Sequence, residues 1–251
     1  MQAIVSDIHS NMEAFAAVLR DIKERGVRDV ICLGDVIGYG PNPKECVDAA
    51  SSFPLVLLGN HEEAVLHEVQ ARGFNRKASS AVRWTAAQFD MLSDAERKAN
   101  ALRWDFLGSL KLEYESNGVL LVHGSPVAPT REYIYPSDAR NPVKLNRIYE
   151  KTQHVCFVGH THVPGVWTED MRYYSPEELG LQFRIDSRKA IFNVGSVGQP
   201  RDLDNRACYV LFDGEVVQWV RVPYDFEATA KKIYAIPELD NWLGDRLREG
   251  K

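Results

Sequence analysis

The sequence lacks the features that would suggest a nucleic-acid or membrane partner. Lysine and arginine total 30 against 35 aspartate and glutamate residues, which leaves a net charge of −5. Proteins that bind nucleic acids usually carry a basic excess or a basic stripe. No stretch approaches the roughly 18 consecutive apolar residues that indicate a membrane span. We therefore expect neither a nucleic-acid duplex nor a membrane as partner.

Cysteine is also scarce, and the start of the chain has no leader-like pattern. The four cysteines lie far apart, without a CxxC pair, at Cys32, Cys46, Cys156 and Cys208. Met1 and Gln2 lead directly into an apolar run, without the basic start and small-residue cleavage site of a signal peptide. These observations predict reduced, structural thiols in a cytoplasmic protein.

Short apolar strands alternate with helices in the first third of the chain. Strands are expected at 3–6, 30–33 and 55–58, and helices at 12–25 and 43–50. Ser10 and Glu13 have the spacing of a capping box at the start of the first helix, and Gly26 is a typical stop signal. This alternation predicts an α/β fold with a parallel or mixed sheet covered on both faces.

The middle of the chain is helical and the last third is rich in strands. The stretch 62–107 has a helical pattern, which we interpret as a cap-like insertion beside the sheet. Strands are expected at 111–115, 119–122, 155–158, 183–185, 190–194, 209–212 and 216–222, and helices at 141–151 and from 227 onward. Ser116-Asn117-Gly118 is a hairpin signal. Because no linker or repeat interrupts the pattern, we predict a single domain over 1–251.

Five of the seven histidines fall in short clusters that directly follow predicted strands. The clusters are Asp7-Ile8-His9, Gly34-Asp35, Gly59-Asn60-His61-Glu62, His123-Gly124 and Gly159-His160-Thr161-His162. Residues at the carboxyl ends of strands in an open α/β sheet meet in one crevice. In an extended segment, the D-x-H and H-x-H spacings would place both side chains on one side. One such cluster alone is more often a turn or a helix cap; five in series indicate a metal site.

The donor set exceeds the needs of one ion. Leaving His61 aside, it comprises two carboxylates, one amide oxygen and four imidazoles, from Asp7, His9, Asp35, Asn60, His123, His160 and His162. Carboxylates and neutral imidazoles suit manganese, iron, zinc or nickel. Two ions that share one carboxylate fit this number better than one, and we expect manganese first.

In their order and residue types, these blocks resemble the calcineurin-like metallophosphoesterases, and in detail the small bacterial and archaeal branch. The resemblance runs from Asp7 to His162 and continues to Asn193-Val194-Gly195-Ser196. It implies a four-layer α/β/β/α sandwich of mixed sheets, here with a helical insertion. It also implies one metal at Asp7, His9, Asp35 and His162, and another at Asp35, Asn60, His123 and His160, with Asp35 bridging.

Two such ions predict a phosphoesterase in which a shared water, deprotonated near neutral pH, attacks phosphorus. His61 adjoins Asn60 and is the candidate general acid, with an electrostatic role toward the phosphate as its alternative. Asp35 is expected to orient it. Arg131, Arg201 and Tyr39 are candidate substrate contacts, although a surface ion pair or ordinary packing would explain them as well. Asn193 and Ser196 are candidate partners of the metal ligands.

Three classes of function are compatible with these residues. The first is hydrolysis of small organic phosphates, namely phosphodiesters, nucleotides or dinucleoside polyphosphates, and we favour it because the helical insertion would shape a pocket. The second is action on macromolecules, as a phosphoprotein phosphatase or a nuclease, and the acidic balance argues against the nuclease. The third is a non-catalytic binding scaffold, which the complete set of donors disfavours.

Overall fold

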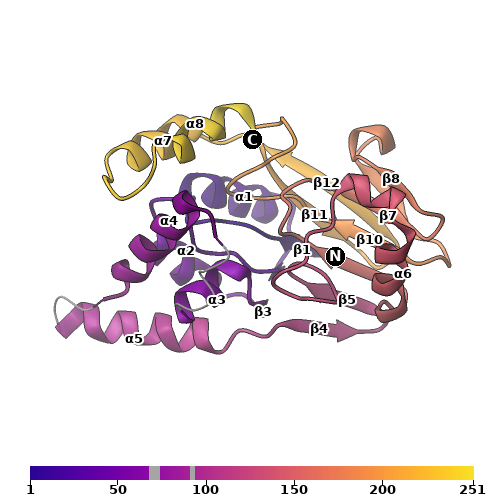
Figure 1. Ribbon diagram of the computed structural model, residues 1–251, viewed down its shortest axis with the longest axis horizontal. Coiled ribbons are helices and arrows are strands. Elements are labelled where there is room, and N and C mark those ends of the chain that lie inside the picture. The colour runs from indigo at the N-terminus through magenta and orange to yellow at the C-terminus, as the bar shows by residue number, and fades with distance from the viewer. Residues whose placement is uncertain (68–73, 91–93) are drawn as a thin grey trace.

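The protein folds into two six-stranded sheets packed face to face (Figure 1). The structure is a computed structural model that describes residues 1–67, 74–90 and 94–251. Both sheets mix parallel and antiparallel neighbours, so the predicted α/β class with mixed sheets is confirmed. Among the helices of these residues, none is both long and apolar enough to cross a bilayer.

The first sheet combines the N-terminal strands with strands from the end of the chain. From edge to edge its strands are β3 Leu55–Val56, β2 Asp29–Cys32, β1 Gln2–Val5, β11 Ala207–Phe212, β12 Val216–Val222 and β9 Gln182–Arg184. The strands β1, β2 and β3 are parallel, and β11 runs antiparallel to β1. The carboxyl ends of the three parallel strands therefore lie at one edge.

The second sheet is formed by the central part of the chain. Its strands, in order, are β4 Glu113–Ser116, β5 Val119–Val122, β6 Val155–Val158, β10 Ala190–Asn193, β7 Gly165–Thr168 and β8 Arg172–Tyr174. The parallel strands are β5, β6 and β10. Asn117 and Gly118 join β4 to β5 with φ values of 52° and 77°, as expected for a two-residue hairpin turn. The hairpin of β7 and β8 was not predicted.

Alternating side chains explain the layers. In β1, Ala3 and Val5 contact the helical layer, whereas Ile4 faces the space between the sheets. In β6, Phe157 faces the same intersheet space, and Val158 packs on the outside with helix α6, which spans Pro142–Lys151. Because consecutive residues of a strand point to opposite faces, fully apolar strands must be covered on both sides. The result is the four-layer α/β/β/α sandwich.

Eight α-helices and two short 3₁₀-helices lie in the described residues. They are α1 Met12–Glu24, α2 Pro43–Ala50, α3 Asn60–Leu66, α4 Arg76–Gln88, α5 Asp94–Gly108, η2 Pro136–Arg140, α6 Pro142–Lys151, η3 Glu177–Leu179, α7 Phe226–Tyr234 and α8 Trp242–Glu249. The predicted insertion 62–107 is helical where it is described; residues 68–73 and 91–93 lie outside the described residues. Helix α4, which belongs to this insertion, packs against the C-terminal helices, because Ala81 lies in one buried cluster with Ile233 and Leu243.

The start of α1 differs from the prediction. Asn11 is the N-cap, and its side-chain oxygen accepts a hydrogen bond from the backbone N–H of Ala14. Ser10 instead has a left-handed φ of 54° and lies buried in the turn after β1. The predicted capping box of Ser10 and Glu13 is therefore wrong by one residue. The loop after β1 is held by long-range contacts that a local motif does not report.

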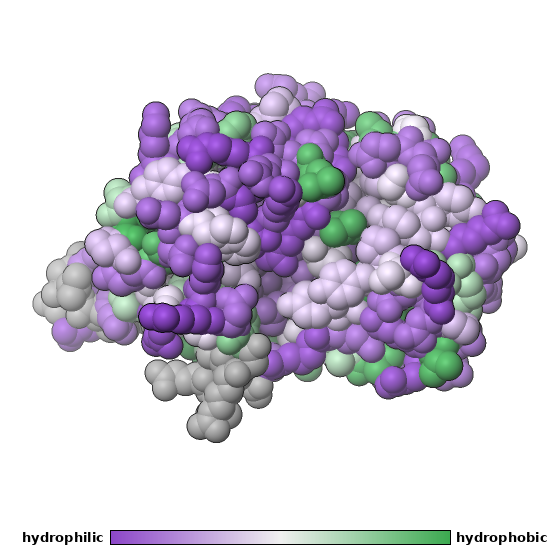
Figure 2. All heavy atoms as spheres, turned by 45° about the horizontal axis from the view of Figure 1, so that its top comes forward, coloured by the Kyte–Doolittle hydropathy of each residue, from purple (hydrophilic) through white to green (hydrophobic). Residues whose placement is uncertain are grey.

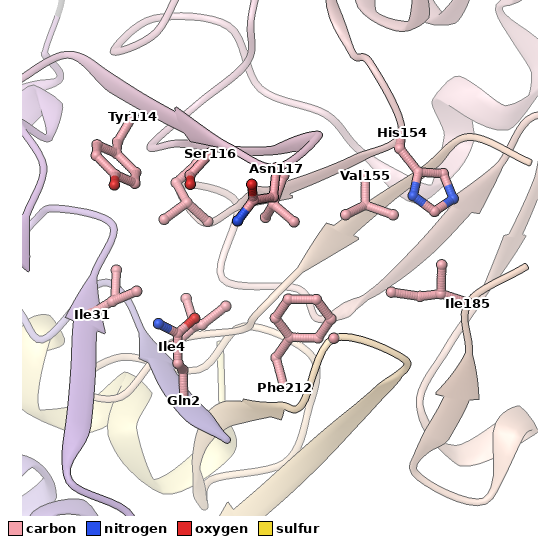
Figure 3. A pocket seen from close by; sticks show the side chains of 13 residues that line it. Gln2, Ile4, Ile31, Tyr114, Ser116, Asn117, His154, Val155, Ile185 and Phe212 are labelled. Atoms are coloured by element: carbon pink, nitrogen blue, oxygen red, sulfur yellow. The ribbon is translucent and has the colours of Figure 1, made fainter. Parts of the chain in front are cut away.

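A cavity of about 380 Å³ opens between the sheets at the edge where β1 and β6 begin (Figure 3). Ile4, Ile31 and Phe212 line its apolar wall, and Asn117 and His154 lie at its polar side (Figure 3). Because the histidine clusters follow the carboxyl ends of the parallel strands, this cavity is at the far end of the sandwich from them. The face seen in Figure 2 is mainly hydrophilic and carries only small, separated hydrophobic patches.

Candidate metal centre

The donor side chains gather where both sheets end. Asp7 and His9 follow β1, Asp35 follows β2, and Asn60 begins α3 just after β3. The other three come from the second sheet, with His123 after β5 and with His160 and His162 after β6. All of them are buried. The fold therefore brings together the seven side chains that were expected from the sequence.

The backbone at five of these seven positions is left-handed rather than extended. The φ values are 54° at Asp7, 48° at His9, 53° at Asp35, 66° at His160 and 62° at His162. The extended D-x-H and H-x-H segments assumed from the sequence are therefore wrong. Non-glycine residues adopt this conformation at a cost and tend to do so at functional sites. Such turns let each short loop direct two side chains into the same space.

The first group of donors consists of Asp7, His9 and His162. The Nε2 atoms of His9 and His162 are 3.0 Å apart, and Asp7 Oδ1 is 3.0 Å from His162 Nε2. On the far side of the rings, His162 Nδ1 lies 2.6 Å from the carbonyl oxygen of Gln199, and His9 Nδ1 lies 3.2 Å from that of Ile37. A proton on each Nδ1 would donate to these carbonyls and leave both Nε2 lone pairs directed into the group.

The second group consists of Asn60, His123 and His160. His123 Nε2 lies 3.1 Å from Asn60 Oδ1 and 3.1 Å from His160 Nδ1. Tyr133 stacks on the His160 ring, with ring centroids 3.7 Å apart and planes inclined by 19°. Tyr133 was not predicted from the sequence, because an aromatic residue eight positions after Gly-Ser has no recognisable spacing relative to a donor more than twenty residues away.

Asp35 lies between the two groups. Its Oδ2 atom is 3.7 Å from His9 Nε2 and 3.4 Å from His123 Nε2, so one oxygen faces one histidine of each group. Its Oδ1 atom accepts a hydrogen bond from the backbone N–H of His61. Asp35 thus contacts the His61 backbone, whereas the expected contact was one that orients the ring.

The electrostatics and the unpaired atoms of this cluster fit bound cations. Burial opposes the charge on Asp7, but the neighbouring His162 outweighs it and holds the pKa of Asp7 below its usual range. Asp7 Oδ1, the carboxylate oxygen nearest to His162 Nε2, is buried and accepts no hydrogen bond. Ring nitrogens this close to one another and to carboxylates are typical of metal ligands, and the donor types suit transition metals.

Glu62 is a buried residue of the site to which the sequence alone assigned no role. Its Oε2 atom accepts hydrogen bonds from the backbone N–H groups of Asp35 and Gly59, and its Oε1 atom accepts one from Ile37. Burial, followed by the charge of Asp35, raises the pKa of Glu62 to about 7. Glu62 therefore holds the loop after β2 against the loop after β3. An acidic residue directly after Asn-His was the only sequence signal for this role.

Asn193 and Ser196 support the loops that carry the donors, as expected. Asn193 Nδ2 donates to the carbonyl oxygen of Gly159 and to Thr161 Oγ1, beside His160. Ser196 Oγ donates to the carbonyl oxygen of Asp7. Asn193 is the last residue of β10 and Ser196 follows shortly after it, so the end of this strand and the connection to β11 stabilise loops of both sheets.

The His61 ring lies in an aromatic environment beside the donors. Its ring centroid is 4.4 Å from that of Tyr39, 4.8 Å from that of His9 and 4.9 Å from that of Phe74. Its Nδ1 atom is buried, and a Cβ atom at Gly38, whose φ is 97°, would lie 2.2 Å from it. Glycine is therefore required at 38. Burial is the main cause that lowers the pKa of His61 to about 4.

The predicted substrate contacts lie at the rim of the site. A pocket of about 340 Å³ beside the second group is lined by Tyr39, Asn60, Phe74, Asn75, Ala78, Thr130, Arg131, Tyr133 and His160. Arg131 forms an ion pair with Glu63, with Nη2 and Oε2 2.9 Å apart. The Arg201 guanidinium lies 5.8 Å from the centre of the Tyr39 ring. All three predicted contacts are thus near the donors.

Comparison with known proteins is consistent with this geometry. Residues 1–215 match the model of the calcineurin-like phosphoesterase superfamily domain. An uncharacterized protein of Methanocaldococcus jannaschii is 37% identical over 259 residues, which cover 100% of this chain and 98% of that protein. The crystal structure of a metallophosphoesterase from Sphaerobacter thermophilus superposes with a TM-score of 0.83 at 34% identity, covering 100% and 98% of the two chains. A hypothetical protein from Pyrococcus horikoshii shares the fold, with a TM-score of 0.75 at 18% identity and coverage of 100% and 99%.

Proposed function

Because the chain belongs to the calcineurin-like phosphoesterase superfamily and is a metal-dependent phosphoric ester hydrolase, we propose that it cleaves P–O bonds of small organic phosphates at two metal ions. The substrates would be phosphodiesters, nucleotides or dinucleoside polyphosphates. The observation that carries the dinuclear proposal is the position of Asp35 Oδ2 between His9 and His123. A single ion would leave one of the two donor groups without a role.

In this proposal each ion has its own donors and shares Asp35. Asp7, His9 and His162 would hold one ion, and Asn60, His123 and His160 the other. When bound, two such ions make a water nucleophilic near neutral pH and offset the charge of the phosphate oxygens. Manganese is the ion that we expect first, while iron, zinc and nickel suit the same donors. The carbonyl oxygens of Gln199 and Ile37 would keep two of the histidines in the required tautomer.

His61 would protonate the leaving oxygen. A nitrogen of its ring lies within 4.8 Å of ligand atoms of His9 and Asp35, so it reaches the edge of the cluster. Burial keeps the ring neutral near pH 7 in the absence of ligands. An anionic phosphate nearby would favour the protonated ring, because opposite charges stabilise one another in a buried site. The proton for the leaving group would therefore be gained as substrate binds.

Three features of the rim support a small substrate. The pocket beside His160 has a volume of about 340 Å³, which is at the lower end of the range for small-molecule sites. Tyr39, Phe74 and Tyr133 supply apolar ring surface, and Arg131 supplies a cation at the edge. The exposed Tyr133 ring also offers a flat face on which a planar leaving group could stack.

The proposal is tested with metal-stripped protein and three esters. Hydrolysis of p-nitrophenyl phosphate, bis-p-nitrophenyl phosphate and a dinucleoside tetraphosphate is measured after Mn²⁺, Zn²⁺ or Mg²⁺ is restored. We expect turnover of at least one ester only with metal, and none with Asp35→Ala, because Asp35 would contact both ions. Turnover that persists in metal-free protein or in Asp35→Ala would contradict the two-metal mechanism.

A further inference from the structure

Two arginines converge on one neutral oxygen at the edge of the metal centre. Arg201 Nη2 donates to Gln199 Oε1 at 2.8 Å, and Arg246 Nη1 donates to the same oxygen at 3.0 Å. The backbone carbonyl of Gln199 is the one that contacts His162 Nδ1. A single residue therefore links both guanidinium groups to a donor of the first metal group.

Packing of the last helix places Arg246 at this position. Leu243 and Leu247 of α8 belong to a cluster of buried apolar residues against which the Tyr39 ring packs. Tyr39 in turn contacts His9 and His61. Figure 1 shows α7 and α8, in yellow, lying together above α1 and α4. The family model ends at residue 215, so Arg246 comes from a part of the chain that the model does not include.

Among the residues that the structure describes, no aspartate or glutamate forms an ion pair with Arg201 or Arg246. Arg246 also donates to the oxygen of Lys251, the last residue of the sequence, and lies over the ring face of Trp242, 4.3 Å from its centre. Arg201 Nε is buried and has no hydrogen-bond partner.

This arrangement is unfavourable until an anion binds. Burial, and then the charge of Arg201, lower the pKa of Arg246 from its usual value. Two half-buried cations that share one neutral acceptor repel each other, whereas a phosphate accepts several charge-assisted hydrogen bonds from guanidinium groups. Lys77, the other cation beside Trp242, is already paired with Asp240 at 3.3 Å. Its charge is therefore largely compensated.

We propose that Arg201 and Arg246 form a subsite for a second phosphate of the substrate, which is bound but not cleaved. This inference rests on the proposed function and narrows its substrate class to compounds with at least two linked phosphates, such as esters of polyphosphates. One phosphate lies at the metal centre, and the next lies against the two arginines. Esters with a single phosphate leave the subsite empty and bind more weakly.

The test compares two anions that differ by one phosphorus. Binding of orthophosphate and of methylenebisphosphonate, which cannot be hydrolysed, is measured by calorimetry on full-length, manganese-loaded protein at fixed free Mn²⁺. Arg246→Gln should weaken binding of the bisphosphonate about tenfold or more, equivalent to roughly 1.4 kcal/mol, and that of orthophosphate much less. Arg246→Lys should restore part of the loss, since it keeps the charge without the planar fork.

Arg248→Gln is the matched control. Arg248 lies on the same helix, but it is exposed and paired with Glu227, with Nε and Oε1 2.6 Å apart. It should bind both anions like the wild type. Equal weakening of both anions by Arg246→Gln, or the same loss in Arg248→Gln, would overturn the subsite.

Turnover of the three esters named above, including the dinucleoside tetraphosphate, by the same wild-type sample separates this inference from the proposed function. Metal-dependent turnover of any of them, combined with bisphosphonate binding that does not depend on Arg246, would refute the subsite alone. Absence of turnover of all three esters, combined with Arg246-dependent binding, would refute the proposed function and leave the subsite standing. Unfolding curves for each variant exclude misfolding as the cause of lost binding.

Discussion

At the scale of single residues, the site depends on side chains that use one polar atom toward the donor cluster and the other toward the backbone. His162 offers Nε2 to the donor cluster and Nδ1 to a backbone carbonyl, and Asp35 offers one oxygen to the cluster and one to the His61 backbone. Each contact on the outer side limits the rotation of the group on the inner side. Such outer contacts fix the tautomer and orientation of metal ligands and raise their basicity.

The role of His61 can be separated from metal binding. His61→Ala removes the proposed acid but none of the proposed ligands, so we expect kcat to fall by about 10²–10⁴-fold while the metal content stays near that of the wild type. The measurements are steady-state turnover of an aryl phosphate ester and metal analysis of the purified protein. His67→Ala, which changes an exposed histidine at the end of the same helix, serves as the control. Unchanged turnover with full metal content would exclude His61 as the acid.

At the scale of elements, the N-cap residues of two helices differ in the number of other segments to which they form hydrogen bonds. Asn141 caps α6 with a single bond to the N–H of Lys144. Asn11 caps α1, but its amide also donates to the carbonyl oxygen of Gly198, and its oxygen accepts from Thr229. Asn11 therefore connects the first helix to the loop after β10 and to α7. This explains why the local capping-box motif at Ser10 was misleading.

This difference predicts that two matched substitutions lower the free energy of unfolding by unequal amounts. Asn141→Ala should lower the free energy of unfolding by about 1 kcal/mol, the usual cost of a lost cap. Asn11→Ala should cost about 2–4 kcal/mol, because it also leaves buried polar groups unpaired. Urea unfolding monitored by circular dichroism measures both. A loss for Asn11→Ala no larger than that for Asn141→Ala would contradict the wider role of Asn11.

At the scale of the whole molecule, the candidate metal centre joins the two sheets. Asp7, His9, Asp35 and Asn60 come from the first sheet, and His123, His160 and His162 from the second. The opposite end of the sandwich contains an open cavity rather than packed side chains (Figure 3). Bound ions would therefore hold the sheets together at one end only.

Metal removal should accordingly destabilise the molecule. Ions present at about 100 times their dissociation constant stabilise the folded state by about 2.7 kcal/mol, which for a chain of this size corresponds to a shift of roughly 5–10 °C in Tm. We expect chelation to lower the Tm by this amount and added Mn²⁺ to restore it. Scanning calorimetry compares the wild type with Asp35→Ala. A wild-type Tm that does not respond to metal would argue against ions that bridge the sheets.

Much of this protein could be predicted from local patterns in its sequence. The buried strands, the helix from Pro43 to Ala50 and the hairpin at Asn117-Gly118 follow from hydrophobic periodicity and turn chemistry, which act over a few residues. The positions of the donors could be predicted for the same reason, since each cluster directly follows an apolar strand. The single domain over 1–251 stays a prediction.

Only the tertiary structure decided which atoms meet. Local sequence patterns do not predict that Glu62 accepts hydrogen bonds from three backbone N–H groups or that Tyr133 stacks on His160. Nor do they predict that Arg246 and Arg201 donate to the same oxygen of Gln199. Apart from the hydrogen bonds that Gly59 and Arg201 donate, these contacts join segments that are separated along the chain by tens of residues. Their geometry depends on the packing of whole layers, because the direction of a buried side chain is set by its neighbours in space and not by its neighbours in sequence.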